Sequence, residues 1–356
     1  MSRWPAMLAR AGELRDRGEY EAARASARRA LNALERDVDP DDTALAQVLT
    51  VLGRAEADLG RYAEAEQILR RAGAAADGSR EMARLRAHAA LAGIFRMQGR
   101  YSEAEALFRR TLVEAEMTLG PDDNDVADIL NDLGITLKYS GGFDEAERLY
   151  RRALAITERT LGPDHPDVAS LYHNLGGLEH ARRDYAKAEP LARRSVEIRK
   201  RALGDEHPDV AADRAALAAI LDGLGEWEEA QTLLRQALTI FERIFGPEHY
   251  EIAINLNNLA AIAHKRGDAA EAESLYRRVV AIKEQVLGRD HPELATTLNN
   301  LAMLFAAGGR HTEADRLFRR AIDLLERSVA PDHPVLLTCR ENHAALLAAG
   351  GIDLRP

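Results

Sequence analysis

Residues 161–203 read LGPDHPDVASLYHNLGGLEHARRDYAKAEPLARRSVEIRKRAL, and the same pattern begins again at Leu203. Glycines recur at intervals of 42 residues along the chain, at Gly120, Gly162, Gly204, Gly246 and Gly288. A fixed period of this length is typical of a solenoid, in which each supersecondary unit packs only against its neighbours. The period therefore predicts one elongated domain, although a length of 356 residues alone would suggest two or three globular ones.

Each repeat contains two helical patterns separated by a turn. In the first pattern, Leu171, Leu175 and Leu178 recur at the spacing of one helix face, which predicts a buried apolar stripe. After the second pattern, Gly204 suits the left-handed backbone just beyond a helix end. Pro208 then suits the first turn of the next helix. The sequence therefore predicts an all-α protein built of helix pairs.

An aromatic residue followed three positions later by alanine marks the turn of most pairs, as at Tyr185 and Ala188. A helix, a turn that usually contains glycine, the aromatic residue and this alanine resemble the signature of the tetratricopeptide repeat. The spacing of 42 residues, with LG-x-D-H-P-D-V-A between units, resembles the kinesin light chain type. The resemblance covers residues 100–350 well and the earlier residues more loosely. It implies a right-handed α-solenoid superhelix that serves as a binding platform for other proteins.

The repeat markers predict about eight helix pairs and one further helix in a single continuous solenoid. Residues 1–119 carry three less regular pairs, residues 120–330 carry five regular pairs, and residues 331–356 form a capping helix with a short tail. The step between the second and third pairs shrinks to 39 residues, and the connector Ala76-Asp77-Gly78-Ser79 lacks the Pro-Asp-His-Pro motif, so we expect a local change in stacking. The predicted helical stretches are 4–36, 43–76, 81–119, 124–161, 166–203, 208–245, 250–287, 292–329 and 334–349.

Composition limits the classes of function. The formal net charge of −10 argues against a surface for nucleic acid or for anionic membranes. The single cysteine, Cys339, provides no intrachain disulfide framework and fits a reducing compartment. No apolar run approaches the ~20 residues that span a bilayer, and the N-terminal MSRWPAMLARAG does not have the pattern of a secretory signal. We therefore expect a cytoplasmic protein.

The sequence contains no motif that predicts catalysis, a metal or a cofactor. Five histidines share the repeat spacing, but each lies in a separate connector, too far from the others to share an ion with ligand distances of ~2.0–2.1 Å. Gly141-Gly142 fits a turn between helices rather than a phosphate-binding loop, and neither G-x-S-x-G nor H-E-x-x-H occurs. We therefore expect a protein that is not an enzyme. The five histidines are His165, His207, His249, His291 and His333.

In a tetratricopeptide stack, the first helix of each pair lines the concave side. At ~100° per residue, the positions opposite the buried Leu175 form this face. Two adjacent positions on it, those of His173 and Asn174, are unusually rich in asparagine across the repeats. Asparagine is a mediocre helix former because its side chain competes for backbone hydrogen bonds. The seven asparagines are Asn131, Asn174, Asn257, Asn258, Asn299, Asn300 and Asn342.

Two interpretations of these asparagines stay open. In one, they bond a neighbouring helix or face water. In the other, they form a ladder of amide clamps that grips the backbone of an extended peptide, because each amide can donate and accept. The resemblance implies the second, since in kinesin light chains the asparagine at the matching place of the L-N-N-L-A motif contacts bound peptide. Asn257-Asn258 and Asn299-Asn300 match this motif, whereas Ala215-Ala216 departs from it.

Charged and histidine side chains share the same predicted face. They are mixed with Asp58, Asp128 and Asp132, so the N-terminal half is either slightly basic or simply a solvated mixture. The residues that complete the predicted peptide-binding set are His173, His180, Arg54, Arg86, Arg96, Lys138 and Lys265.

The sequence thus predicts a protein–protein interaction module that binds an extended peptide or partner segment in its concave groove. The identity of the partner and the oligomeric state are not specified by the sequence. Two alternatives stay open. One is a peptide-responsive regulator whose superhelix changes pitch on binding, and the other is a structural scaffold that binds through its convex surfaces.

Overall fold

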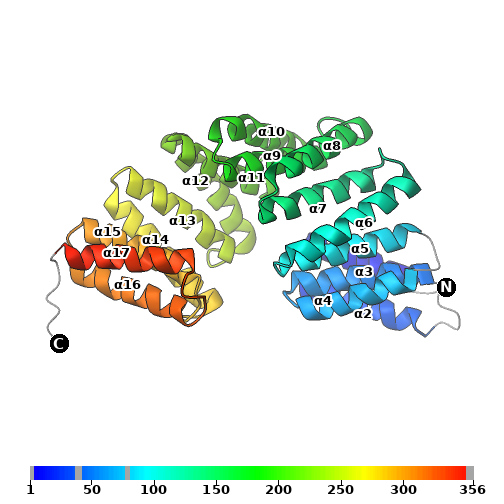
Figure 1. The fold of residues 1–356 in the computed structure, drawn as a ribbon, viewed down its shortest axis with the longest axis horizontal. Helices are drawn as coiled ribbons and strands as arrows, with labels where there is room; N and C mark the ends of the chain where they lie inside the picture. The colour runs from blue at the N-terminus through cyan, green and yellow to red at the C-terminus, as the bar shows by residue number, and fades with distance from the viewer. Residues whose placement is uncertain (1–3, 37–41, 77–80, 350–356) are drawn as a thin grey trace. The chain divides into compact units, whose positions relative to one another are not determined.

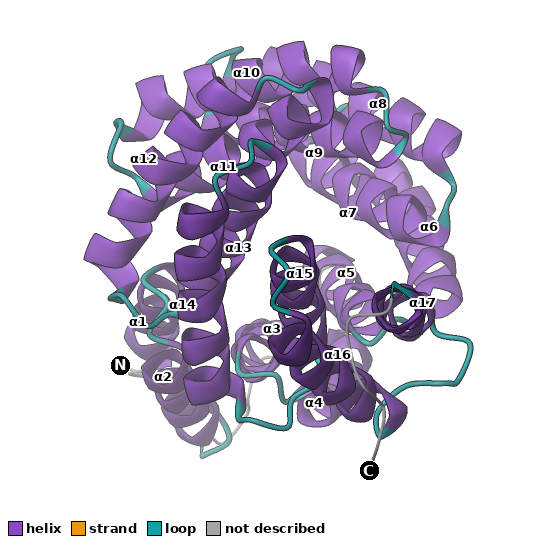
Figure 2. Ribbon diagram, turned by 90° about the vertical axis from the view of Figure 1, so that its left-hand side faces the viewer, coloured by secondary structure: helices purple, strands orange, loops and turns teal. Residues whose placement is uncertain are grey.

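The computed structural model describes residues 4–36, 42–76 and 81–349, and this part of the chain forms helices joined by short loops, with no strand (Figures 1 and 2). The predicted all-α solenoid of helix pairs is confirmed. Successive helices pack against each other in pairs, and the helices fall within the predicted stretches, except that α3 begins one residue earlier, at Asp42. The helices are α1 (Trp4–Asp16), α2 (Tyr20–Leu34), α3 (Asp42–Asp58), α4 (Tyr62–Ala75), α5 (Glu81–Met97), α6 (Tyr101–Leu119), α7 (Asn124–Ser140), α8 (Phe143–Leu161), α9 (Pro166–Ala181), α10 (Tyr185–Leu203), α11 (Pro208–Leu224), α12 (Trp227–Phe245), α13 (Tyr250–Lys265), α14 (Ala269–Leu287), α15 (Leu294–Ala307), α16 (His311–Glu326) and α17 (Pro334–Ala348).

The chain divides into two compact units, Met1–Leu178 and Glu179–Pro356, with the boundary inside α9. Most of the connector 76–79 and the end of the predicted tail lie outside the described residues. The expected change in stacking at that connector and the division of one continuous solenoid at residues 119 and 330 therefore stay predictions.

Small residues allow the two helices of each pair to approach closely. The alanine three positions after the aromatic marker is fully buried in every pair, as at Ala104, Ala146 and Ala230, each 0% exposed. Gly134 serves the same purpose on α7, because a Cβ there would lie 2.7 Å from the ring of Tyr150 on α8. These contacts between small and large side chains bury the apolar faces that the sequence pattern identified.

The connectors between pairs combine an unusual glycine backbone with a histidine cap. Gly204 has φ 87° and ψ 157°, so the expected left-handed conformation is corrected: φ is positive, but ψ lies in an extended region that is essentially restricted to glycine. Three residues later, Nδ1 of His207 accepts a hydrogen bond from the backbone N–H of Asp209 at 3.2 Å. His207, His249 and His333 are thus N-caps of first helices, which satisfies an otherwise unpaired amide. His291 accepts the same hydrogen bond from Glu293, but α15 begins only at Leu294.

The turn inside each pair is left-handed at one position. Gly141, Gly225 and Gly267 have φ between 83° and 87° there, and Arg183 takes the same place with φ 61°. Arg183 is the only described residue other than glycine with a positive φ. An arginine in this conformation carries a steric cost that glycine avoids.

The backbones of neighbouring first helices approach one another, whereas second helices are linked to one another only through side chains. In the first unit, the backbone of α1 lies close to α3, α3 to α5, and α5 to α7, but no such approach joins α2 with α4 or α4 with α6 among the described residues. The same holds for α11, α13, α15 and α17 in the second unit. The first helices of each unit therefore form a continuous face, and the predicted peptide-binding residues lie on these helices.

Candidate peptide-binding face

Two adjoining hollows lie on the first-helix face of the first unit. A hollow of ≈ 520 Å³ lies between α1, α3 and α5, and one of ≈ 330 Å³ lies between α3, α5 and α7. Arg54, Met82 and Arg86 line both. The first has an apolar floor that includes Leu8 and Val51, and carboxylates line the second. Two of the predicted basic residues, Arg54 and Arg86, therefore lie at open cavities suited to bind a ligand.

The charges around these hollows are of both signs. Arg54 forms no ion pair with a described residue, and burial together with the nearby Arg15 cation lowers the pKa of its guanidinium. Arg86 pairs with Asp125 at 3.4 Å. Burial, and then the Asp167 carboxylate, raises the pKa of Asp128 to about 6. A positive wall and a negative wall thus face the same space.

The remaining predicted basic residues of the first unit are less available. Arg96 lies 3.6 Å from Asp132, whose pKa is raised by burial. Lys138 lies over the ring of Tyr139 at 5.1 Å, and burial lowers the pKa of its ammonium group. His173 is half-buried on α9. In the second unit, His180 meets the ring of Tyr185 edge-on, with 5.5 Å between ring centres.

A hydrogen-bonding register joins neighbouring first helices. The amide of Asn174 donates to Oδ1 of Asn131 at 2.7 Å, and the amide of Asn342 donates to Oδ1 of Asn299 at 3.0 Å. The two residues of each pair are 43 positions apart, one more than the repeat of 42. Four of the predicted clamps are thus hydrogen-bonded across neighbouring helices, which is the first of the two interpretations that the sequence left open.

The same register also holds ion pairs. Nζ of Lys265 lies 2.6 Å from Oδ2 of Asp222, and Arg15 pairs with Asp58. Both pairs again join residues 43 positions apart. Lys265, which is among the predicted ligand contacts, is therefore neutralised by a carboxylate of the preceding first helix.

The other asparagines of the second unit have different surroundings. Asn257 accepts a hydrogen bond from the hydroxyl of Thr297 at 3.4 Å, and Asn300 hydrogen-bonds to Tyr276. The Asn258 side chain makes no hydrogen bond to a described residue. The reason is visible in the register, because the residue 43 positions earlier is Ala215, which has no polar group to offer. Asn258 therefore keeps its donors and its acceptor available.

Parts of this face were not predicted from the sequence. Arg15 occupies the same helical position as Arg96 and Lys138, and the turn marker at Gly18 would have placed it there. The apolar floor formed by Leu8 and Val51 was also missed, because apolar residues on the face of a first helix look like core residues in sequence. Neither the 43-residue register nor the hollows have a signature in one sequence.

Within the described residues, no group of histidine, cysteine and acidic side chains is arranged to hold a metal ion. The sulfur of Cys339 lies in the core beneath α17, where burial raises the pKa of its thiol. No helix in this part of the chain is both long and apolar enough to cross a membrane.

The fold and this face define a class of protein, a helical-repeat scaffold for interactions with other proteins. The chain belongs to the tetratricopeptide repeat family, whose model matches residues 6–77, 83–159, 139–201, 167–243, 214–285, 251–327 and 293–351. Such scaffolds are typically not enzymes.

Solved structures place it among the kinesin light chain-like members. BtubC (BKLC) from P. vanneervenii is 26% identical with a TM-score of 0.55, covering 64% of this chain and 92% of that one. A putative kinesin light chain of Podosopora anserina, in a form with one substitution, is 26% identical with a TM-score of 0.50, covering 57% of this chain and 96% of that one. A Rap protein complexed with Competence and Sporulation Factor shares the fold over 99% of this chain and 100% of its own, at 14% identity and a TM-score of 0.62. A search of curated protein sequences finds no match.

Proposed function

We propose that this protein binds an extended peptide segment of a partner protein along the face formed by its first helices. The observation that supports this most directly is the pair of adjoining hollows that share Arg54, a cation without an ion pair among the described residues. A guanidinium held in such a place favours a carboxylate or a peptide carbonyl as its partner.

Asn258 is the amide clamp that we expect to contribute most in the second unit. Asn131, Asn174, Asn299 and Asn342 are already joined in interhelical pairs. A ligand that uses them would have to exchange one hydrogen bond for another, which yields little net free energy. Asn258 has no such partner to lose, so its amide can hold a peptide N–H and C=O at no internal cost.

The protein in this proposal is a cytoplasmic scaffold without enzymatic activity or cofactor, and it binds neither nucleic acid nor membranes. The peptide-responsive regulator and the scaffold that acts through its convex surfaces stay as alternatives from the sequence. Small-angle scattering with and without the bound peptide distinguishes the peptide-responsive regulator from the proposed scaffold, because only the regulator changes its superhelical pitch on binding.

The test is a selection of extended peptides on the full chain, followed by affinity measurements on Arg54→Gln and Asn258→Ala. We expect each variant to lose ~0.5–1.5 kcal/mol of binding free energy for peptides that bind near the changed residue. Arg235→Gln on the second helix α12 is the matched control and should bind like the wild type. If both variants bind every selected peptide with unchanged affinity, the proposed face is wrong.

A further inference from the structure

The side of α6 away from the first-helix face carries a stripe that the other second helices lack. Ala106, Arg110, Val113 and Met117 recur at the spacing of one helix face. Val113 is 58% exposed and Met117 is 83% exposed. Two neighbouring apolar side chains with this exposure, one turn apart, form an apolar ridge in contact with solvent.

The repeats themselves show that this ridge is unusual. In the later second helices, the position of Val113 holds small or polar residues and the position of Met117 holds long polar ones. The residues matching Val113 are Ala155, Glu197, Thr239, Ala281 and Asp323. The residues matching Met117 are Arg159, Arg201, Arg243, Gln285 and Arg327. The later second helices thus carry small or polar residues at these two positions. Among these helices, only α6 carries large apolar residues at both.

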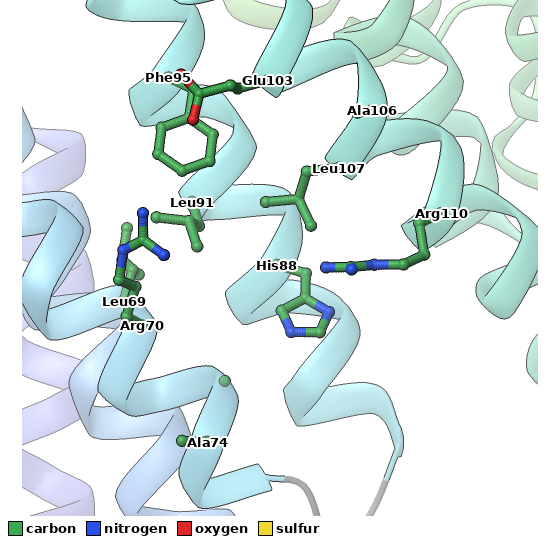
Figure 3. A pocket seen from close by; sticks show the side chains of 11 residues that line it. Leu69, Arg70, Ala74, His88, Leu91, Phe95, Glu103, Ala106, Leu107 and Arg110 are labelled. Atoms are coloured by element: carbon green, nitrogen blue, oxygen red, sulfur yellow. The ribbon is translucent and has the colours of Figure 1, made fainter.

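The ridge continues into a hollow of ≈ 530 Å³ between α4, α5 and α6 (Figure 3). Ala106 and Arg110 belong to both the stripe and the wall of the hollow. Leu91 and Phe95 of α5 line the hollow, and Figure 3 shows Arg110 reaching from α6 across it toward His88. Because the backbones of α4 and α6 stay apart, the hollow opens between them, and Leu91 and Phe95, which are 7% and 5% exposed, form its floor.

The ion pair beside the hollow does not by itself explain this surface. Glu66 of α4 pairs with Arg100, the N-cap residue of α6, at 2.8 Å. At the junction of α14 and α16, Glu273 pairs in the same way with Arg310 at 2.5 Å. There, however, the ridge positions are Asp323 and Arg327. The α14–α16 junction is therefore a polar counterpart of the same geometry.

The array also indicates which chemistry complements Arg110. At the same position of other second helices, Arg152, Arg278 and Arg320 each pair with a glutamate of the preceding second helix, at 2.5–2.7 Å. Arg110 forms no ion pair with a described residue, and the matching residue of the preceding pair, Asp77, lies outside the described part. A carboxylate presented from a helix is the partner that this arginine has elsewhere in the chain.

We propose that the ridge of Val113 and Met117, together with the hollow beside it, is a second docking surface that binds an acidic amphipathic helix of another protein. Apolar side chains of that helix fill the hollow and cover the ridge, and an aspartate or glutamate next to them pairs with Arg110. The ridge and Arg110 belong to α6, and the hollow lies between α4, α5 and α6, whereas the hollows of the peptide-binding face lie among α1, α3, α5 and α7. One chain then holds two partner segments on different sides of the first unit.

The test uses a displayed library of alanine-based helical peptides with randomised positions on one face, selected on the full chain. The variant Arg110→Gln/Val113→Thr/Met117→Arg places on α6 the residues that α12 carries at the same positions, so the helix should tolerate them. We expect selected peptides to combine apolar residues with aspartate or glutamate and to lose at least about tenfold in affinity on this variant. Arg327→Ala at the C-cap of α16 and Asn258→Ala on the first-helix face should bind them like the wild type.

Three results would overturn the proposal. The first is a selection that enriches no helix above the background seen with the triple variant. The second is enrichment of basic rather than acidic helices. The third is self-association of the wild type that the triple variant abolishes, which would assign the surface to a second copy of this chain.

Discussion

The pairing of Asn299 with Asn342 predicts that two chemically identical substitutions on the first-helix face have opposite effects on stability. Asn299 is 8% exposed and accepts a hydrogen bond from Asn342 at 3.0 Å. Asn258 lies on the same face, in the adjacent helical position of α13, without a partner among the described residues. Alanine at either position changes helix propensity equally, so the difference between the variants measures the hydrogen bonds of Asn299, which are the one from Asn342 and a longer one to Asn300 at 3.5 Å.

The sizes of two contributions, helix propensity and hydrogen bonding, decide whether each substitution raises or lowers the free energy of unfolding. Replacing asparagine by alanine in a helix interior contributes up to ~0.7 kcal/mol of stability. At Asn258 nothing opposes this gain, so the free energy of unfolding should stay equal or rise. At Asn299 the lost hydrogen bond costs ~0.5–1.5 kcal/mol, and the half-buried amide of Asn342 that loses its acceptor adds to that cost. We therefore expect Asn299→Ala to be less stable than Asn258→Ala by ~1 kcal/mol or more.

Urea unfolding of both variants and the wild type measures this difference, provided that the denaturant slope is the same for all three. The double variant Asn299→Ala/Asn342→Ala completes a cycle, in which the coupling between the two asparagines should be ~0.5–1.5 kcal/mol. Equal stability of Asn258→Ala and Asn299→Ala, with no coupling to Asn342, would refute the assignment of a structural role to the pair.

Further predictions concern the backbone and the charges. Gly204→Val should destabilise the array by ~1–3 kcal/mol in a thermal melt, because a Cβ there meets no atom within 4 Å and the cost is purely conformational; an unchanged melt would contradict this. Arg183→Gly should leave stability unchanged or raise it by up to ~1 kcal/mol, because it relieves a positive φ of 61°; a clear loss would show that the arginine side chain contributes more than its backbone costs. The pKa of Asp128 is raised to about 6, so its ionisation opposes folding. Stability from this group is fully present below the unfolded pKa near 4 and is lost as pH rises through 6. Asp128→Asn should therefore stabilise the protein at pH 7 but not at pH 4, and equal effects at both pH values would contradict it.

The helix pairs were predictable because the residues that form them recur at a fixed period. Each pair repeats the same buried leucines, the same alanine and the same connector, so one period of sequence specifies every later unit. Even the role of Gly204 was partly predictable, since a positive φ at a helix end requires glycine. Its ψ of 157° was not, because the direction in which the chain leaves the helix depends on how the next pair packs.

The hydrogen-bond partners of the asparagines on the first-helix face were not predictable, because they also depend on how neighbouring pairs pack. A repeat of 42 residues suggests that equivalent positions face each other, but neighbouring first helices are rotated so that contacts join residues 43 apart. This offset pairs one asparagine column with the other. The same offset places Ala215 opposite Asn258. Because Ala215-Ala216 departs from the motif, the amide of Asn258 is left available.

The most direct test of peptide binding on the first-helix face is site-specific photo-crosslinking with a selected extended peptide. A photoreactive side chain is placed at position 258 on α13, and in a second protein at the exposed position of Arg235 on α12. We predict that the peptide crosslinks from position 258 and not from position 235. Crosslinking from position 235 alone would contradict the account, because it would place the bound peptide on the second helices.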